Sequence, residues 1–198
     1  FVAKYDDSGT WQWTEQIGTA DGEIAFDITI DSSSNVYVTG YTQGGLHGVN
    51  AGSTDLFVVK YDSAGVKQWT QQLGTSTFQN AYGITNDSSD NIYITGNSQG
   101  GLDDPSNAYG DQDIFVAKFD GVGNRLWHRL YGTPARDMTR GIVCDSSDNI
   151  YLTGHTYGNL DGHTNAGGTD IFVIKMNTAG IKQWTMQYET TSGTDIAA

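Results

Sequence analysis

Cysteine, proline, basic residues and long apolar runs are all scarce in this sequence, and most of these shortages exclude a class of protein. One cysteine among 198 residues cannot form an internal disulfide. Ten basic residues against 23 acidic ones give a net charge of −13, whereas nucleic acids and anionic membranes are bound through basic surfaces. No apolar run reaches the length of about eighteen residues that a membrane-spanning helix needs. We therefore expect neither nucleic-acid binding nor membrane insertion.

Glycine and strand-forming residues are abundant by contrast, and large side chains recur with a fixed period. The sequence contains 26 glycines, which suit tight turns between short strands. Phenylalanine recurs at positions 1, 57, 115 and 172, and tryptophan at 13, 69, 127 and 184, with steps of 56 to 58 residues. A period of this length with several short strands is typical of a β-propeller.

Each complete repeat contains four segments with the pattern of β-strands. The first segments cover residues 25–31, 81–87 and 139–145, and the second cover 36–40, 92–96 and 150–154. The third begin at the repeated phenylalanines, and the fourth follow turns at Gly9, Gly65, Gly123 and Gly180, where glycine supplies a positive φ. The pattern predicts an all-β fold: a β-propeller segment of four-stranded antiparallel blades in about three and a half repeats.

Length and period together predict one partial propeller domain over residues 1–198. Its repeats cover residues 1–56, 57–114, 115–171 and, incompletely, 172–198. Aromatic side chains on both faces of short strands need cover on both faces, as when each blade packs on the next. We expect Trp69, Trp127 and Trp184 to be mostly buried against an adjacent blade, near a repeated glycine such as Gly96 or Gly154. Open strand edges should be covered by the remainder of a longer chain or by a second copy that completes the ring.

Four segments resemble a known family, the bacterial seven-bladed β-propeller-type repeats (SBBP-like repeats). They are Asp-Ile-Phe-Val-Ala-Lys-Phe-Asp at 113–120, Gly-Val-Lys-Gln-Trp at 65–69, Asp-Ser-Ser-Asp-Asn-Ile-Tyr-Ile-Thr-Gly at 87–96 and the loop at 159–170. The resemblance covers essentially the whole chain and implies an exported or surface-associated bacterial protein. The Asp-x-x-Gly-x-x-x-Trp segment is also similar to the tryptophan-docking motif of quinoprotein propellers, but the further cofactor and metal ligands of those enzymes are not found here.

The connections between strands are of two kinds, and only one kind suits recognition. In an up-and-down blade, alternate connections lie at the same end, so the Asp-Ser-Ser turns and the glycine hairpins share one face. The opposite face, which we call the long-loop face, carries the loops at 44–55, 100–113 and 159–170. Long variable loops suit binding better than uniform turns. Residues present in every repeat are explained by what every blade needs, so a specific site should lie where the repeats differ.

Two sets of residues on the long-loop face are candidates for binding. Clustered Asp and Asn oxygens with glycines between them suit a hard cation such as Ca²⁺. The candidate calcium ligands are Asp103, Asp104, Asn107, Asp111, Asp113, Asp161, Asn165 and Asp170. Alternatively, these oxygens cap their own turns through Asx bonds. The candidate ligand-binding aromatics, which stand outside the repeated set, are Phe78, Tyr109 and Tyr157.

The remaining polar residues are expected to be structural, and no catalytic set stands out. The repeated third-strand lysines, of which Lys60 and Lys118 are examples, should pair with the Asp that opens each first turn. Four arginines between 125 and 140 suit either an anion or partner patch or local charge compensation. Cys144 is expected to be a buried, inert thiol.

The sequence favours a non-catalytic binding or scaffold module of an exported or cell-surface bacterial protein. We expect a protein or a carbohydrate to bind the long-loop face, with Ca²⁺ as the one cofactor that the sequence suggests. The alternative is a propeller enzyme, such as a lyase, a glycoside-acting or a quinone-dependent protein, with its site in the central channel or on the long-loop face. An enzyme should gather titratable groups with shifted pKa values in one cleft between blades.

Overall fold

The computed structural model describes residues 1–102 and 108–188 and confirms an all-β architecture. Its strands are β1 (Val2–Tyr5), β2 (Trp11–Glu15), β3 (Glu23–Ile30), β4 (Val36–Thr42), β5 (Asp55–Tyr61), β6 (Lys67–Leu73), β7 (Gln79–Asn86), β8 (Ile92–Ser98), β9 (Asp113–Phe119), β10 (Arg125–Tyr131), β11 (Asp137–Cys144), β12 (Ile150–Thr156), β13 (Asp170–Met176) and β14 (Lys182–Tyr188). A short 3-10 turn, η1 (Leu160–Gly162), lies in the loop between β12 and β13. No helix of the described residues is long and apolar enough to cross a membrane.

The strands form three four-stranded antiparallel sheets and one two-stranded sheet. Blade 1 contains β3 to β6, blade 2 contains β7 to β10 and blade 3 contains β11 to β14, each in sequence order across the sheet. β1 and β2 pair with each other and form the N-terminal hairpin. The blades begin at the predicted first strands, so they are out of phase with the sequence repeats, which begin at third strands. The predicted strand at 25–31 is found at Glu23–Ile30.

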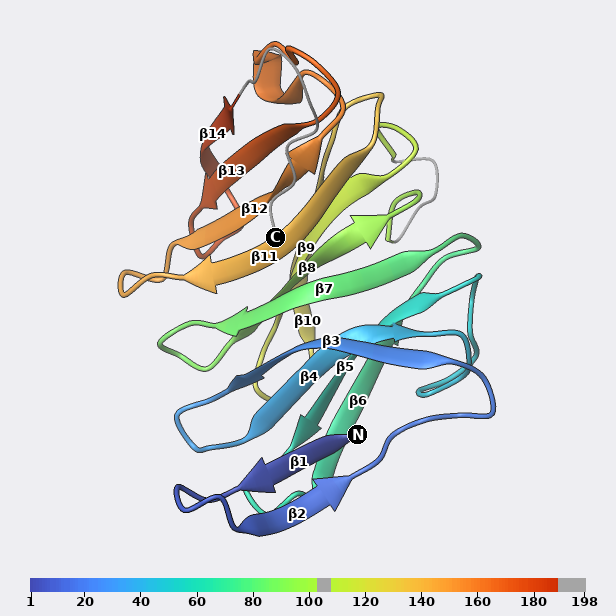
Figure 1. The fold of residues 1–198 in the computed structure, drawn as a ribbon, viewed down its shortest axis with the longest axis vertical. Coiled ribbons are helices and arrows are strands. Elements are labelled where there is room, and N and C mark those ends of the chain that lie inside the picture. The colour runs from blue at the N-terminus through green and yellow to red at the C-terminus, as the bar shows by residue number, and fades with distance from the viewer. Residues whose placement is uncertain (103–107, 189–198) are drawn as a thin grey trace.

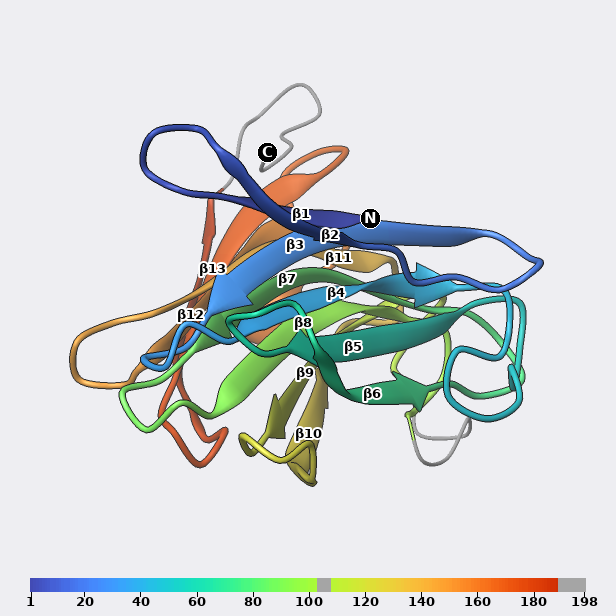
Figure 2. The same cartoon turned by 90° about the horizontal axis from the view of Figure 1, so that it is seen from below.

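The sheets lie one above the other, with the N-terminal hairpin at one end and blade 3 at the other (Figure 1). The short turns project on one side of this stack and the long loops on the other, as predicted (Figure 1). The first strands β3, β7 and β11 lie side by side along one edge, which we call the inner edge, and β6 and β10 lie along the opposite edge (Figure 2). This arrangement is the one expected for consecutive propeller blades.

Apolar side chains of neighbouring blades pack together and form the core. Tyr37 and Val58 of blade 1 are buried in one cluster with Ile84, Ile92 and Phe115 of blade 2. A second cluster joins blades 2 and 3, and a third joins the N-terminal hairpin to blade 1. Each fully buried aliphatic or aromatic side chain stabilises the folded chain by about 1.5–3 kcal/mol. The interfaces between sheets therefore contribute much of the stability.

Candidate functional site

A cluster of repeated polar and aromatic residues links strands within blades 1 and 2. In blade 2, the Tyr93 hydroxyl donates a hydrogen bond to Asp87 at 2.9 Å. Lys118 Nζ lies 3.1 Å from the same carboxylate and 4.7 Å from the centre of the Tyr93 ring. In blade 1, Lys60 Nζ lies 3.8 Å from Asp31. The predicted ion pairs between lysine and aspartate are thus confirmed in these two blades, and their recurrence assigns them to the scaffold.

Hydrogen bonds hold the repeated aspartates in the ionised form. Burial acts to raise the pKa of Asp87, but hydrogen bonds from Asn91, Tyr93 and Lys118 outweigh it, so the pKa lies below its usual value. Asp31 has a lowered pKa for the same reasons, with hydrogen bonds from Asn35 and Tyr37. These carboxylates cap their own turns, as the Asx interpretation predicts.

The repeated tryptophans contact the hairpin of the next blade. The Trp69 indole N–H donates to Gly121 O at 3.3 Å, and a Cβ built on Gly123 would lie 3.0 Å from Trp69 Cδ2. Trp13 and Trp127 make the equivalent contacts with Gly65 and Gly180. The tryptophans therefore do contact an adjacent blade, as predicted, but at a different glycine.

The prediction named Gly96 and Gly154 as the contact points, and this was wrong. A Cβ on Gly96 would lie 2.8 Å from Ala81 Cα and 2.7 Å from a ring carbon of Phe115, all within its own blade. These glycines admit the bulged first strand. Trp69 and Trp127 are partly buried, and Trp184 is 38% exposed because no described residue covers it.

The first turns are also linked from blade to blade. Ser88 donates from its backbone N–H and its hydroxyl to the two carboxylate oxygens of Asp148, at 2.8 and 2.7 Å. Ser32 makes the same two contacts with Asp90. The Asp-Ser-Ser-Asp-Asn turns are therefore part of the contact between blades. Their carboxylates are occupied by protein donors and have no need of a metal ion.

Residues that differ between repeats gather on the inner edge. Each first strand contains a β-bulge, and the bulged residues are Phe26, Tyr82 and Arg140. The Phe26 and Tyr82 rings meet edge to face with centroids 4.8 Å apart, and the Arg140 guanidinium lies 5.4 Å from the Tyr82 ring centre. Phe26 is 45% exposed. We call these three residues the inner-edge row.

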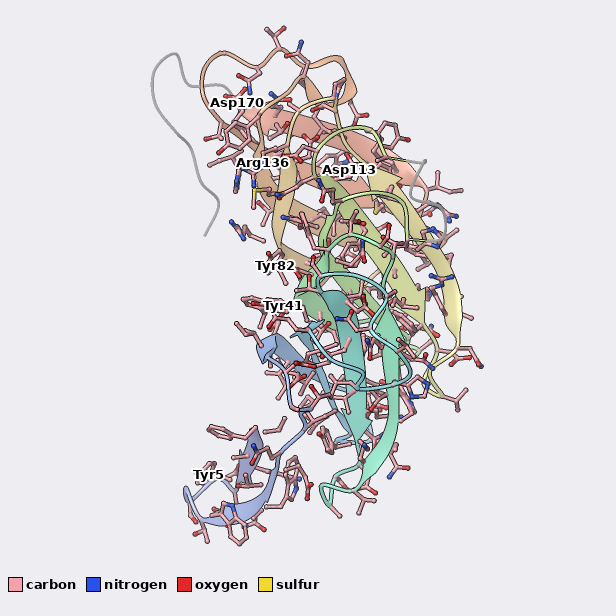
Figure 3. The ribbon with its side chains drawn as sticks, turned by 90° about the vertical axis from the view of Figure 1, so that its right-hand side faces the viewer. Tyr5, Tyr41, Tyr82, Asp113, Arg136 and Asp170 are labelled. Atoms are coloured by element: carbon pink, nitrogen blue, oxygen red, sulfur yellow. The ribbon has the colours of Figure 1, made fainter. Side chains whose placement is uncertain are left out.

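A second set of unrepeated residues lies beside this row, on the second strands. Tyr41, Asn97 and His155 occupy equivalent places, because each pairs with the residue two before a bulge. The Tyr41 ring centre lies 5.8 Å from that of Phe26, and Figure 3 shows Tyr41 beside Tyr82. Neither Asn97 Nδ2 nor His155 Nδ1 has a hydrogen-bond partner among the described residues, although both atoms are buried. The site thus combines aromatic rings, a cation and unused polar atoms.

The charge near blade 3 is positive, unlike that of the molecule. Burial and the nearby guanidinium groups of Arg140 and Arg136 lower the pKa of His155, which is therefore neutral near pH 7. Arg140 makes no ion pair with any described residue, whereas Arg136 lies 3.6 Å from Asp111. Arg129 stacks on Trp127 at 5.3 Å. Since these arginines have different neighbours, they do not form one patch.

The predicted calcium ligands are dispersed, and those that the structure describes have protein partners. Asp103, Asp104 and Asn107 lie outside the described residues. Asp111 pairs with Arg136 and accepts from Gln99, Asp161 pairs with Lys182 and Thr185, and Asn165 bonds within its loop. Asp113 and Asp170 are buried and accept hydrogen bonds from Tyr109 N and Ala166 N. In the described ranges, no three His, Cys, Asp or Glu residues lie close enough to hold a metal ion.

A pair of buried carboxylates nevertheless lies at the junction of blades 2 and 3. A side chain on Gly132 would collide with Asp113 Oδ1 and would lie 3.2 Å from Asp137 Oδ2, so the two oxygens flank the same small space. Burial raises the pKa of both groups, and the charge of Asp137 raises that of Asp113 further. Gln79 stands in the place of Asp137 at the junction of blades 1 and 2. Both aspartates are fully buried, so no substrate reaches them.

The predicted ligand-binding aromatics do not form one surface. Tyr109 and Tyr157 are exposed, and the Tyr157 ring lies 6.1 Å from that of His155. Phe78 is partly buried and bridges to Thr54 through the backbone. Cys144 is half-buried rather than buried, and burial raises the pKa of its thiol to about 11, as expected of an inert thiol. The inner-edge residues were missed, although an alignment of the repeats would have shown that their positions vary.

The family and curated relatives agree with the fold. A family model described as a beta-propeller repeat (SBBP) matches residues 12–47, 68–103 and 126–161, together more than half of the chain. An uncharacterised WD repeat-containing protein of Acanthamoeba polyphaga mimivirus is 23% identical over 208 residues, covering 84% of this chain and 15% of that protein. The regulatory protein FlaEY of Caulobacter vibrioides is 28% identical over 167 residues, covering 75% of this chain and 17% of that protein.

Solved structures give weaker similarity. A protein of unknown function from Bacteroides caccae aligns with a TM-score of 0.41 and 10% identity, covering 96% of this chain and 75% of that chain. An inactive virginiamycin B lyase from Staphylococcus aureus aligns with a TM-score of 0.29 and 12% identity, covering 91% of this chain and 74% of that chain. Similarity at this level carries no functional argument.

Proposed function

The chain belongs to the SBBP family of beta-propeller repeats, and from that premise we propose that it is a non-catalytic binding module for a protein partner. The observation that supports this most is the inner-edge row. Phe26, Tyr82 and Arg140 replace one another at the same position of consecutive repeats and contact each other. A scaffold requirement would place the same residue in every blade, so a row that varies is better explained by a ligand.

The chemistry of the site suits a protein surface. Tyrosine and arginine are enriched among the residues that contribute most to protein–protein binding, and they do so from partly covered positions. Arg140 has no carboxylate partner among the described residues, so it is available to an acidic side chain or a carbonyl group. Asn97 and His155 supply further polar atoms beside it. We infer that the partner contributes an acidic or carbonyl-rich segment to this edge.

No observation favours the enzyme alternative as specifically. The carboxylates with raised pKa values, Asp113 and Asp137, are sealed inside the junction of two blades. A catalytic acid or base must reach its substrate. Export to the cell surface and assistance by Ca²⁺ stay predictions, for which cell fractionation and the calcium titration described below are the tests.

The proposal is tested by affinity capture with matched variants. Tyr82→Ala and Arg140→Ala remove the inner-edge row, whereas Val122→Ala alters a side chain that is 73% exposed in the hairpin between β9 and β10. A protein held by the wild-type chain and by Val122→Ala, and lost with both inner-edge variants, supports the proposal. Equal retention by all variants contradicts it. A glycan array that gives ligands when no protein is captured points to a carbohydrate instead.

A further inference from the structure

One edge of the N-terminal hairpin has no neighbouring strand. The other third strands, β5, β9 and β13, each lie between a second strand and a fourth strand. Among the residues that the structure describes, β1 pairs with β2 alone. Its second edge therefore presents unpaired backbone N–H and C=O groups, which favour the addition of another strand.

The side chains around this edge are uncovered, whereas their equivalents elsewhere are buried. Phe1 is 87% exposed and Tyr5 59%, but Phe57 and Tyr61 in the same places of β5 are 1% exposed. Ile28 on the adjoining strand β3 is 53% exposed, and its equivalent Ile84 is 4% exposed. In blade 2, the strands β3 and β4 of the preceding blade provide that cover. The N-terminal hairpin has no such strands within the described residues.

Two open, largely apolar grooves flank β1. One has a volume of about 260 Å³ and is lined by residues that include Phe1, Val2, Phe26 and Val38. The other has a volume of about 320 Å³ and is lined by residues that include Tyr5, Trp13, Ile30 and Val36. They lie at the end of the stack where Tyr5 is labelled in Figure 3. Together they form a slot on either side of a free strand edge.

A lysine in the slot lacks the ring that its equivalents contact. Lys60, Lys118 and Lys175 each lie 4.7 to 5.1 Å from the centre of a second-strand tyrosine ring. The tyrosine stands directly opposite the lysine in all three strand pairs. Lys4 occupies the same place on β1, where it donates only to Ser63 O at 3.0 Å. A tyrosine opposite Lys4 would complete the repeated arrangement.

We propose that the free edge of β1 binds a second strand from another repeat of this type. The register within the chain sets its sequence: Tyr37 pairs with Lys60 and Gly40 pairs with Phe57. By the same register, the incoming strand places a tyrosine opposite Lys4 and a glycine opposite Phe1. The second strands share the pattern Val/Ile-Tyr-Val/Ile/Leu-Thr-Gly, whose small glycine leaves room for a phenylalanine ring. The partner is therefore an extended segment with this pattern, added antiparallel to β1.

A labelled peptide with the sequence of residues 145–156 is the probe, titrated into the 198-residue chain and followed by fluorescence anisotropy. We expect saturable binding of one peptide per chain. Changing the peptide tyrosine, Tyr151→Ala, should weaken binding by about tenfold, because the ring over Lys4 and its buried apolar surface are lost. Tyr151→Phe keeps the ring and should weaken binding much less. A scrambled peptide should not bind.

Matched variants of the protein separate this slot from non-specific attraction. Lys4→Ala should weaken peptide binding by about fivefold, whereas Lys67→Ala makes the same change in charge on exposed β6 and should have no effect. Thermal midpoints check that both variants stay folded. The proposal is overturned by the absence of saturable binding, by equal affinity for the Tyr151→Ala peptide, or by equal effects of the two lysine variants. Self-association of the chain that the peptide does not compete with overturns it as well.

Discussion

At the scale of single residues, the same amino acid has different roles according to its neighbour. Gly65, Gly123 and Gly180 have positive φ and receive a tryptophan from the preceding blade, whereas Gly9 has positive φ and nothing within 4 Å of its Cβ position. The sequence predicted the turn glycines because only their conformation was needed. It did not predict which glycine meets the tryptophan, since that contact joins residues more than fifty positions apart.

Gly123→Ala should destabilise the chain more than Gly9→Ala. Both substitutions place a side chain in the left-handed region, which costs about 1–2 kcal/mol. Only at Gly123 does the new methyl group press on an indole, 3.0 Å from Trp69 Cδ2. Urea unfolding should therefore show a larger loss for Gly123→Ala. Equal losses would show that the tryptophan contact contributes little.

Asp137→Gln should stabilise the chain near neutral pH. Burial raises the folded-state pKa of Asp137 and of Asp113, so ionising them costs stability that appears as the pH rises above their unfolded pKa values of about 4. Removing one carboxylate should add about 1 kcal/mol near pH 7, and the gain should disappear below about pH 4, where both groups are protonated in both states. Gln79 already fills the equivalent place between blades 1 and 2. Unfolding curves at the two pH values are the measurement, and a gain that persists in acid would contradict this account.

At the scale of strands and turns, the sequence predicted the number, order and approximate bounds of the strands. Strands with β-branched and aromatic residues between repeated turns leave few alternatives. The bulges at Phe26, Tyr82 and Arg140 were not predicted, because an extra residue in a strand leaves no mark on a single sequence. Those bulges turn the three side chains toward each other and so create the candidate site.

Ser88→Ala should destabilise the chain and Ser146→Ala should not. Ser88 donates two hydrogen bonds to Asp148 in the next blade. Ser146 stands in the same place of blade 3, and no described residue provides it with such a carboxylate. The loss for Ser88→Ala should be about 1 kcal/mol in urea unfolding. A comparable loss for Ser146→Ala would show that the hydroxyl acts within its own turn.

At the scale of the whole molecule, the repeated positions account for the fold and the unrepeated ones for the candidate site. The candidate calcium ligands were chosen from their density in the sequence, but the described members are held by arginine, lysine, glutamine and backbone donors. The inner-edge row was invisible for the opposite reason. Its members are far apart in sequence and differ in type, and only the packing of first strands brings them together.

If calcium assists the fold, thermal midpoints should be higher in excess Ca²⁺ than in a chelator, because binding to the folded state stabilises it by mass action. Asp111→Asn should reduce that response without unfolding the blades. Asp62→Asn is the matched control, since Asp62 caps the hairpin between β5 and β6, away from the long loops. Equal midpoints in calcium and chelator would mean that the acidic loops only cap their own turns.

The most direct test of the central claim, that a partner binds where the repeats differ, is calorimetric titration of a captured partner with two arginine variants. Arg140→Ala removes a member of the inner-edge row, and Arg129→Ala removes an equally charged residue that stacks on Trp127 on the fourth strand. We predict that Arg140→Ala weakens binding by about tenfold or more, as expected for an arginine at the centre of an interface, and that Arg129→Ala leaves it unchanged. Unchanged affinity for Arg140→Ala, or an equal loss for both variants, would contradict the claim.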